Sequence, residues 1–297
     1  MHKYLRAIGF RQIKNRKQLQ VLITDCIRSA KKRDYISMSE RDDFVFMECC
    51  KEFADGIGIA VRGEFDENNN YIYNYYFPYV RGSYVSSEED ISIERHAEKE
   101  SYAGVCDDLR LGVSLIFYFQ NVITYLKLKE KNKIPVKGTS LVLSALSCQG
   151  MVIMPIIKNE RDKKKVRQVT RNRSHLLAAA RRGDEEAIEN LTLEDMDTYT
   201  VISKKIQKED VFSLVDTYFM PYGVECDQYS VLGEIMDCQK VQNSLSGEYL
   251  YRMTINCNDL LFDVCINEAD LLGEPAVGRR FKGIVWMQGF IDFPESE

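Results

Sequence analysis

The sequence predicts an α+β fold in three parts: a mixed N-terminal α+β domain over 1–157, a basic linker and helical segment over 158–222, and a C-terminal antiparallel β-sheet or OB-like small barrel over 223–297. Three observations support this prediction. Apolar residues recur at helical spacing near the N-terminus, they alternate at strand spacing in the last quarter, and a highly charged stretch separates the two patterns. With 297 residues, 45% of them hydrophobic, the chain is long enough to bury a substantial core.

The first expected element is a helix over 16–30, because five apolar residues there repeat at offsets 0, 3, 4, 7 and 8 of one helical face. They are Leu19, Leu22, Ile23, Cys26 and Ile27. Strands are predicted over 44–50 and 56–65, followed by a hairpin turn. The aromatic stretch 71–84 is expected to form a further strand that is contacted on both faces and ends at Pro78.

The next region is predicted from its changes of polarity. Residues 86–108 are polar and acidic, which favours a loop or a weak helix. A buried strand is then expected over 110–121 and a short helix over 122–132. Residues 139–156 are predicted as a hairpin that turns near 148–150.

The middle segment is the least apolar part of the chain. The basic run 158–173 has no periodicity and is expected to be a linker or an exposed arm. Residues 175–191 resemble one helical hairpin of an ankyrin repeat, in which Gly183 closes one helix and Asp184 caps the next. A single copy cannot form a stacked array, so this resemblance implies no ankyrin function. A last helix is expected over 211–219.

The C-terminal hairpin has a register that follows from its turn. If Asn258 and Asp259 form a tight two-residue turn, Cys257 lies opposite Leu260. The pairs that follow are Ile255 with Phe262, Met253 with Val264, Tyr251 with Ile266, Arg252 with Cys265, Thr254 with Asp263, and Asn256 with Leu261. A slip of one residue would bury the polar set, so the register is strongly specified. A short helical turn is expected over 268–275, and this order of elements resembles an OB-like barrel.

The last strand, over 279–290, supplies the candidate binding residues. Alternation places Phe281, Val285 and Met287 on one side. The other side holds Arg280, Lys282, Ile284, Trp286 and Gln288. We hypothesise that Arg280, Lys282, Trp286 and Gln288, with Arg279 at the rim, form a contact surface for an unknown protein or small-molecule partner. The alternative is that this face is covered by the rest of the protein, with the helix over 211–219 as one candidate cover.

Charge is distributed in blocks, although the net charge is only −5. Residues 1–33 hold ten Lys or Arg and one Asp, which gives a net charge of +9. Residues 158–182 hold ten Lys or Arg and two acidic residues, which gives a net charge of +8. These basic blocks either pack near acidic segments or face the solvent, or they form a basic groove that attracts phosphates. Nucleic-acid association is therefore an alternative function, although the overall acidity does not favour it.

No known cofactor or catalytic motif is present in the sequence. A G-x-G-x-x-G phosphate loop fails because Val61 stands where the third glycine is needed, and a calcium loop from Asp66 fails at Tyr71. No C-x-x-C pair exists among the nine cysteines, which are expected to be reduced thiols. We therefore expect no cofactor and no metal. An enzyme with an unrecognised carboxylate site stays open as a second alternative.

Three stretches carry a family resemblance: MHKYLRAIGF at the N-terminus, YYFPYVRG, and DLLGEPAVGRRFKGIVWMQG near the C-terminus. They resemble an uncharacterised family of clostridial bacteria, over the whole chain. The resemblance implies a bacterial cytoplasmic protein and supplies no catalytic residues. No signal peptide and no apolar run long enough for a bilayer is found, so the sequence predicts a cytoplasmic, non-enzymatic binding or interaction module.

Overall fold

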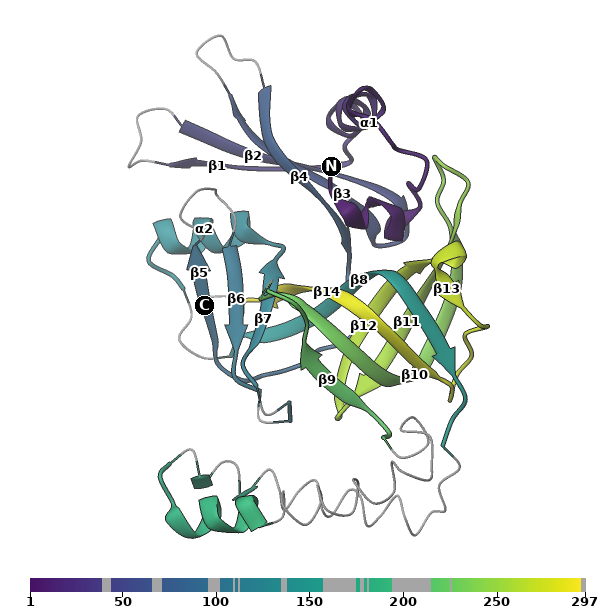
Figure 1. Cartoon of the computed structure of the whole chain (residues 1–297). Helices are drawn as coiled ribbons and strands as arrows, with labels where there is room; N and C mark the ends of the chain where they lie inside the picture. Colours follow the sequence, from purple (N-terminus) through teal and green to yellow (C-terminus); the bar gives the residue numbers. More distant parts are fainter. Residues whose placement is uncertain are drawn as a thin grey trace.

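Two β-sheets form the body of the protein, and a short N-terminal segment lies between them (Figure 1). This arrangement comes from a computed structural model. The structure describes residues 1–38, 44–65, 71–95, 102–108, 110–111, 113–134, 138–156, 175–176, 179–180, 182–193, 215–224 and 226–294. The fold is α+β, with a closed barrel in its C-terminal part, as the sequence predicts.

The smaller sheet is antiparallel and has four strands in chain order. They are β1 (Lys32–Met38), β2 (Phe44–Ala54), β3 (Ile57–Phe65) and β4 (Tyr71–Val80). The strands predicted over 44–50 and 56–65 are confirmed. The prediction that the fourth strand ends at Pro78 is wrong, because β4 continues to Val80. β4 is an edge strand, and the Pro78 carbonyl points away from β3, so the missing N–H of proline costs no ladder hydrogen bond.

The larger sheet closes on itself as a five-stranded barrel. Its strands are β8 (Ser140–Ile153), β10 (Gln228–Gln242), β11 (Tyr249–Cys257), β12 (Leu260–Asn267) and β14 (Arg280–Asp292). They pair in the order β8-β12-β11-β10-β14, and β14 pairs back onto β8 over twelve positions. β8 precedes the predicted boundary at residue 157, so sheet hydrogen bonds cross that boundary. The resemblance to an OB-like barrel stays a prediction.

β8 corrects another expectation. The predicted hairpin over 139–156 is wrong, because these residues form one continuous strand. Gly150 does not turn the chain there. A Cβ on Gly150 would lie 2.4 Å from the ring of Phe281, so glycine at this position allows close packing in the barrel.

The hairpin β11–β12 has the predicted register at every pair. Asn258 and Asp259 have φ angles of 54° and 63°, which is the geometry of a type I′ turn. On the outer face, Arg252 Nη2 lies 3.0 Å from Asp263 Oδ2, so these two diagonal neighbours form an ion pair. The residues of this turn therefore determine the register of the β11–β12 pair in the barrel.

Three further strands extend the larger sheet beyond β14. They are β5 (Ile91–Arg95), β6 (Tyr102–Cys106) and β7 (Leu115–Phe119), with α2 (Val122–Glu130) after them. The strand and helix predicted over 110–121 and 122–132 are confirmed. The loop or weak helix predicted over 86–108 is wrong at 91–95 and 102–106, because apolar residues alternate in β5 and β6 and their inner faces join the core. Residues 96–101 lie outside the described residues.

β9 (Tyr218–Pro221) is a strand that pairs with β10, so the helix predicted over 211–219 is wrong at its end, and 211–214 lie outside the described residues. Phe219 turns inward and is 5% exposed. The remaining short elements after β12 are η2 (Glu268–Asp270) and β13 (Leu271–Leu272), where η2 confirms the predicted helical turn.

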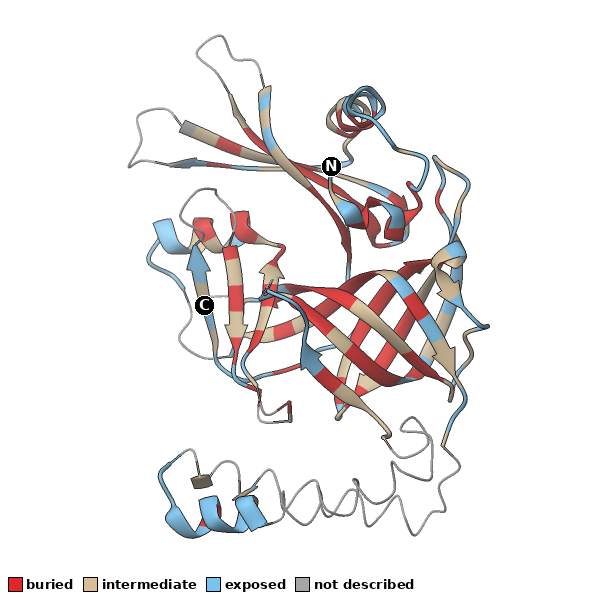
Figure 2. Ribbon diagram, viewed as in Figure 1, coloured by how far each residue is buried: buried red, intermediate tan, exposed pale blue. Residues whose placement is uncertain are grey.

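The N-terminal segment packs against the smaller sheet, and its first part, residues 3–8, lies between that sheet and the barrel (Figure 2). It comprises η1 (Lys3–Ile8) and the predicted helix, α1 (Arg16–Arg28). Buried residues of both elements join a core with β2, β3, β4 and the outer face of the barrel, whereas a second core fills the barrel itself. In the middle segment, Gly183 has φ 85° and Asp184 Oδ1 accepts from Ala187 N, as predicted for a helix end and a cap. Most of the basic run 158–182 lies outside the described residues.

Candidate functional site

The predicted contact surface on β14 faces the interior of the protein. Trp286 is 5% exposed, and its ring stacks on Tyr4 with centroids 5.2 Å apart. The indole Nε1 donates to Asp227 Oδ2 at 2.6 Å. The alternation predicted along β14 is right, but the N-terminal segment covers the face, so the expected exposed surface is wrong for Trp286.

The other four residues are not brought together as an open surface either. Gln288 is fully buried and Arg280 is 4% exposed. Arg280 donates to the carbonyls of Met154 and Val215, at 3.1 and 2.8 Å. Arg279 and Lys282 are half-buried, and a role for these two in partner binding stays a prediction.

The side chain of Gln288 connects the two sheets through hydrogen bonds. Its Nε2 donates to the carbonyl of Pro78 at 2.8 Å, and its Oε1 accepts from Gln120 Nε2 at 2.9 Å. Gln120 Nε2 and Ser144 Oγ both donate to the carbonyl of Val80, at 3.0 and 2.7 Å. These side chains satisfy the outer edge of β4 in place of a neighbouring strand, so β4 is held against the barrel.

A cleft of about 370 Å³ opens beside this junction, between one face of β2–β4 and the ends of β8 and β14. Its volume lies within the range of small-molecule pockets. Phe77, Tyr79, Val142 and Phe290 contribute rings and aliphatic surface. The other lining residues are Lys32, Glu48, Cys50, Ala60, Arg81, Gly82, Gln120, Asn121 and Asp292.

Glu48, which lines this cleft, belongs to a buried ion pair. Arg62 is fully buried, and its Nε donates to Glu48 Oε2 at 2.5 Å. Tyr75 Oη accepts from Arg62 Nη1 at 3.1 Å, and the ring of Phe77 lies 4.7 Å below the guanidinium. Burial disfavours the charge, but Glu48 holds the pKa of Arg62 above its ordinary value. The pair therefore satisfies a cation that water cannot reach.

Glu48 also faces the cleft, because its side chain is 13% exposed. Arg62 and the thiol of Cys50, which lies 3.5 Å from Oε1, fix the direction of the carboxylate. Burial, with Glu48 as a further cause, raises the pKa of Cys50, so this thiol stays protonated and is a poor nucleophile. The wall therefore presents an oriented hydrogen-bond acceptor.

Charges of both signs lie at the mouth of the cleft. Arg81 pairs with Glu52 at 3.1 Å, and its side chain is 48% exposed. The side chains of Lys32 and Asp292 have no ion pair or hydrogen bond within the described part of the chain. Tyr79 is buried, and its hydroxyl has no hydrogen-bond partner among the described residues. Donors and acceptors are thus available on different sides of the same cleft.

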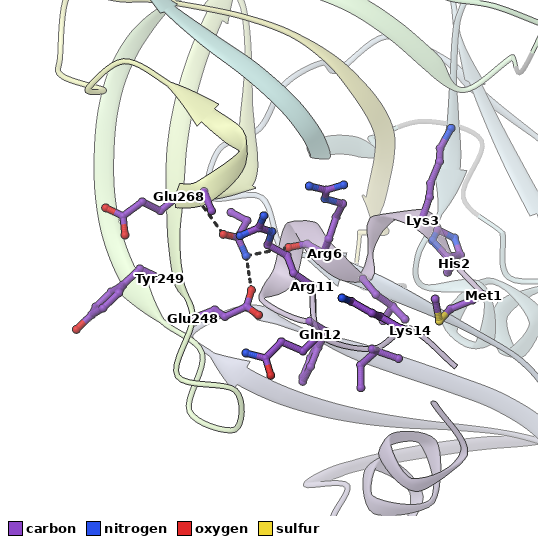
Figure 3. Close-up of a pocket in the computed structure, with 15 residues that line it drawn as sticks. Met1, His2, Lys3, Arg6, Arg11, Gln12, Lys14, Glu248, Tyr249 and Glu268 are labelled. Carbon is purple, nitrogen blue, oxygen red and sulfur yellow. Dashed lines mark hydrogen bonds between the residues drawn. The ribbon is translucent and has the colours of Figure 1, made fainter. Parts of the chain in front are cut away.

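A second, wider hollow of about 920 Å³ lies under the N-terminal segment (Figure 3). Lys3, Arg6, Arg11 and Lys14 come from one side and Glu248, Tyr249 and Glu268 from the other. Both arginines pair with Asp270, Arg6 through two hydrogen bonds and Arg11 at 3.6 Å. Acids thus neutralise part of the positive charge that the sequence places in 1–33, and the hollow has mixed charge.

The sequence contains a signal for the buried ion pair. Glu48 is the one charged residue in FVFMECC, and Arg62 is the one basic residue in GIGIAVRGEF. In the β2–β3 hairpin these two residues are direct partners. A lone acid and a lone base on two adjacent predicted strands indicate such a pair.

The comparison with protein families places the chain. The family model described as "Domain of unknown function, E. rectale Gene description (DUF3881)" matches residues 5–289. The chain belongs to the DUF3881 family. The predicted resemblance to an uncharacterised family is thereby confirmed over nearly the whole length. No curated protein and no solved structure matches this DUF3881 chain.

Two features are absent from the described residues. Among them, no three His, Cys, Asp or Glu side chains gather in a way that could hold a metal ion. In the same residues, no helix is long and apolar enough to cross a membrane. The cytoplasmic location stays a prediction.

Proposed function

We propose that this DUF3881 protein is a non-enzymatic binding protein that holds a small ligand in the cleft between β2–β4 and the barrel. The observation that carries the proposal is the Glu48 carboxylate, which Arg62 orients at the wall of a cleft lined with aromatic rings. Apolar walls with a few fixed polar groups are the usual composition of ligand pockets. The cleft is also held open by buried contacts, because Gln120 and Gln288 join β4 to the barrel beside it.

Binding fits these residues better than catalysis. Glu48 neutralises Arg62, and loss of its charge during a reaction cycle would leave a buried cation without a partner. The one cysteine that lines the cleft has a raised pKa and is held protonated. Asp292 is the other carboxylate of the cleft, and it lies at the exposed mouth. The alternative of a carboxylate enzyme therefore has less support.

The test is a variant that fills the cleft. Val142 lines the cleft from β8, and Val142→Phe would occupy part of its volume. Val21 is 71% exposed on α1, so Val21→Phe adds the same atoms away from the cleft. In native mass spectrometry and a thermal-shift screen of small molecules, we expect wild type and Val21→Phe to hold the same ligands and Val142→Phe to lose them. Equal binding by all three proteins would contradict the proposal.

Nucleic-acid association is a second candidate, because four cations from residues 3–14 line the hollow under η1. Phosphate binding of this kind weakens steeply with salt. Arg11→Glu with Lys14→Glu should then abolish binding of a single-stranded oligonucleotide at low ionic strength. If the wild-type protein shows no salt-dependent binding, this candidate is removed and the cleft proposal is unaffected.

A further inference from the structure

We infer that the ligand of the cleft is a planar heteroaromatic ring with two adjacent N–H donors, as in guanine or a pterin. This inference rests on the proposed binding function and adds the chemical class of the ligand. Three features of the cleft carry it: the acceptor at its wall, the rings beside that acceptor, and the charges at its mouth.

The acceptor determines which edge of the ligand faces the wall. A carboxylate has about four lone-pair positions. Arg62 and Cys50 use two of those on Glu48, which lines the cleft with a side chain that is 13% exposed. A ligand that approaches with an acceptor would meet like charge, whereas a pair of N–H groups matches both oxygens of a carboxylate in parallel. The ligand must therefore present donors to Glu48.

The walls determine the shape of the ligand. Phe77 and Tyr79 line the cleft from β4, and Phe290 lines it from β14. Rings on two different elements favour a flat, apolar body between them, since stacking on aromatic side chains is how proteins hold unpaired bases. At about 370 Å³ the cleft is at the small end of ligand pockets, so it suits a bicyclic ring with one substituent.

The mouth determines what the rest of the ligand carries. Lys32 and Arg81 lie there with Asp292, so donors outnumber acceptors at the exposed end. A phosphate on the substituent would meet a cation at this end while the N–H edge of the ring meets Glu48. A purely apolar ligand would leave both ends of the cleft unmatched.

The test uses ligand pairs, so that it does not depend on a variant that fails to fold. We expect guanosine to bind the wild-type full chain in calorimetry, and 1-methylguanosine, which lacks one of the two N–H donors, to bind at least ten-fold more weakly. Glu48→Gln keeps the shape and one acceptor for Arg62, and it should lower guanosine affinity by a similar factor. A guanine-containing single-stranded oligonucleotide forms the second arm, because tighter binding of the oligonucleotide than of guanosine would identify nucleic acid as the source of the base.

The outcomes separate this inference from the proposed function. If aromatic compounds without N–H donors bind as well as guanosine, and Val142→Phe still abolishes their binding, the cleft binds ligands but the inferred class is wrong. Equal affinity for guanosine and 1-methylguanosine would also overturn it. If no compound distinguishes wild type from Val142→Phe, the binding function itself fails.

Discussion

Tyrosines on β4 differ in how their hydroxyls are satisfied, although they lie on one strand. Tyr75 Oη accepts from the buried Arg62, whereas Tyr79 Oη is buried without a partner among the described residues. A buried polar atom without a hydrogen bond costs about 1–3 kcal/mol. The two residues therefore make opposite contributions to stability through the same chemical group.

The same substitution at both positions tests this difference. Tyr79→Phe should leave the free energy of unfolding unchanged or raise it by up to about 1 kcal/mol, because it removes an unsatisfied hydroxyl. Tyr75→Phe should lower it by about 1–2 kcal/mol, since Arg62 loses an acceptor. Urea denaturation of the two variants gives the comparison. Equal losses in both would show that Tyr79 Oη has a partner such as an ordered water.

Trp286 provides a second test at the residue scale, because it was expected at the surface and lies in the core. Trp286→Ala should destabilise the protein by about 3–5 kcal/mol, the usual cost of removing a buried aromatic side chain. Tyr84 is 50% exposed, and Tyr84→Ala is the matched control with an expected loss within about 0.5 kcal/mol. If Trp286→Ala folds and loses little free energy of unfolding, Trp286 is not part of the core and the predicted contact surface is supported.

The burial of Trp286 could not be predicted because its cover is distant in sequence. Alternation along β14 separates the two faces correctly, but it does not reveal what packs on each face. His2 and Tyr4 supply the cover, with ring centroids 4.7 and 5.2 Å from the indole. Glu48 and Arg62 were within reach of prediction, because they are partners in a local hairpin.

At the scale of elements, the hairpin β11–β12 was predictable to the residue, and β8 was not. A two-residue turn with Asn and Asp at positive φ fixes every later pair. Gly150 in β8 looked like a turn signal, but it serves the close approach of Phe281. A glycine in such a sequence can mark either a turn or a site of close packing, and only the tertiary packing distinguishes the two roles.

The turn of that hairpin allows a direct test. Asp259 has φ 63°, where glycine is favoured and a β-branched side chain is strained. Asp259→Gly should raise the free energy of unfolding by about 0.5–1 kcal/mol, and Asp259→Val should lower it by about 1–2 kcal/mol. The backbone carbonyl that accepts from Arg110 Nη1 is retained in both variants. Thermal denaturation should rank glycine above aspartate and aspartate above valine, and any other order would exclude a type I′ turn.

At the scale of the whole molecule, the N-terminal segment joins the two sheets. Residues of η1 pack on the barrel, on β4 and on the core shared with α1. Predicted parts 1–157 and 223–297 therefore share one core and one barrel, to which β8 contributes a strand. No local pattern contains this information, since it depends on contacts between residues more than 200 positions apart, such as Ala7 with Cys265.

His2 lies where the N-terminal segment contacts the barrel, and it makes the stability of the protein depend on pH. Burial, with the nearby charges of the chain's amino group and of Lys3, lowers the pKa of His2 to about 4 from an ordinary value of 6.5. Its Nδ1 is buried without a hydrogen-bond partner among the described residues, and its ring lies against Trp286. The folded protein therefore holds His2 neutral at a pH where the unfolded chain protonates it.

The sign of the effect follows from this difference in pKa. Above pH 6.5 the imidazole is neutral in both states, so the full stability is present. As the pH falls from 6.5 towards 4, the unfolded state binds a proton that the folded state excludes, and the free energy of unfolding drops. Between pH 7 and pH 4.5 we expect wild type to lose roughly 1–2.5 kcal/mol more than His2→Gln, in which this titration is absent. Exposed His175 is the matched control, and His175→Gln should follow the wild-type profile. If the free energies of unfolding of wild type and His2→Gln fall in parallel with pH, the N-terminal segment detaches from the barrel before His2 is protonated. Its contacts with the barrel would then be weaker than the packing indicates.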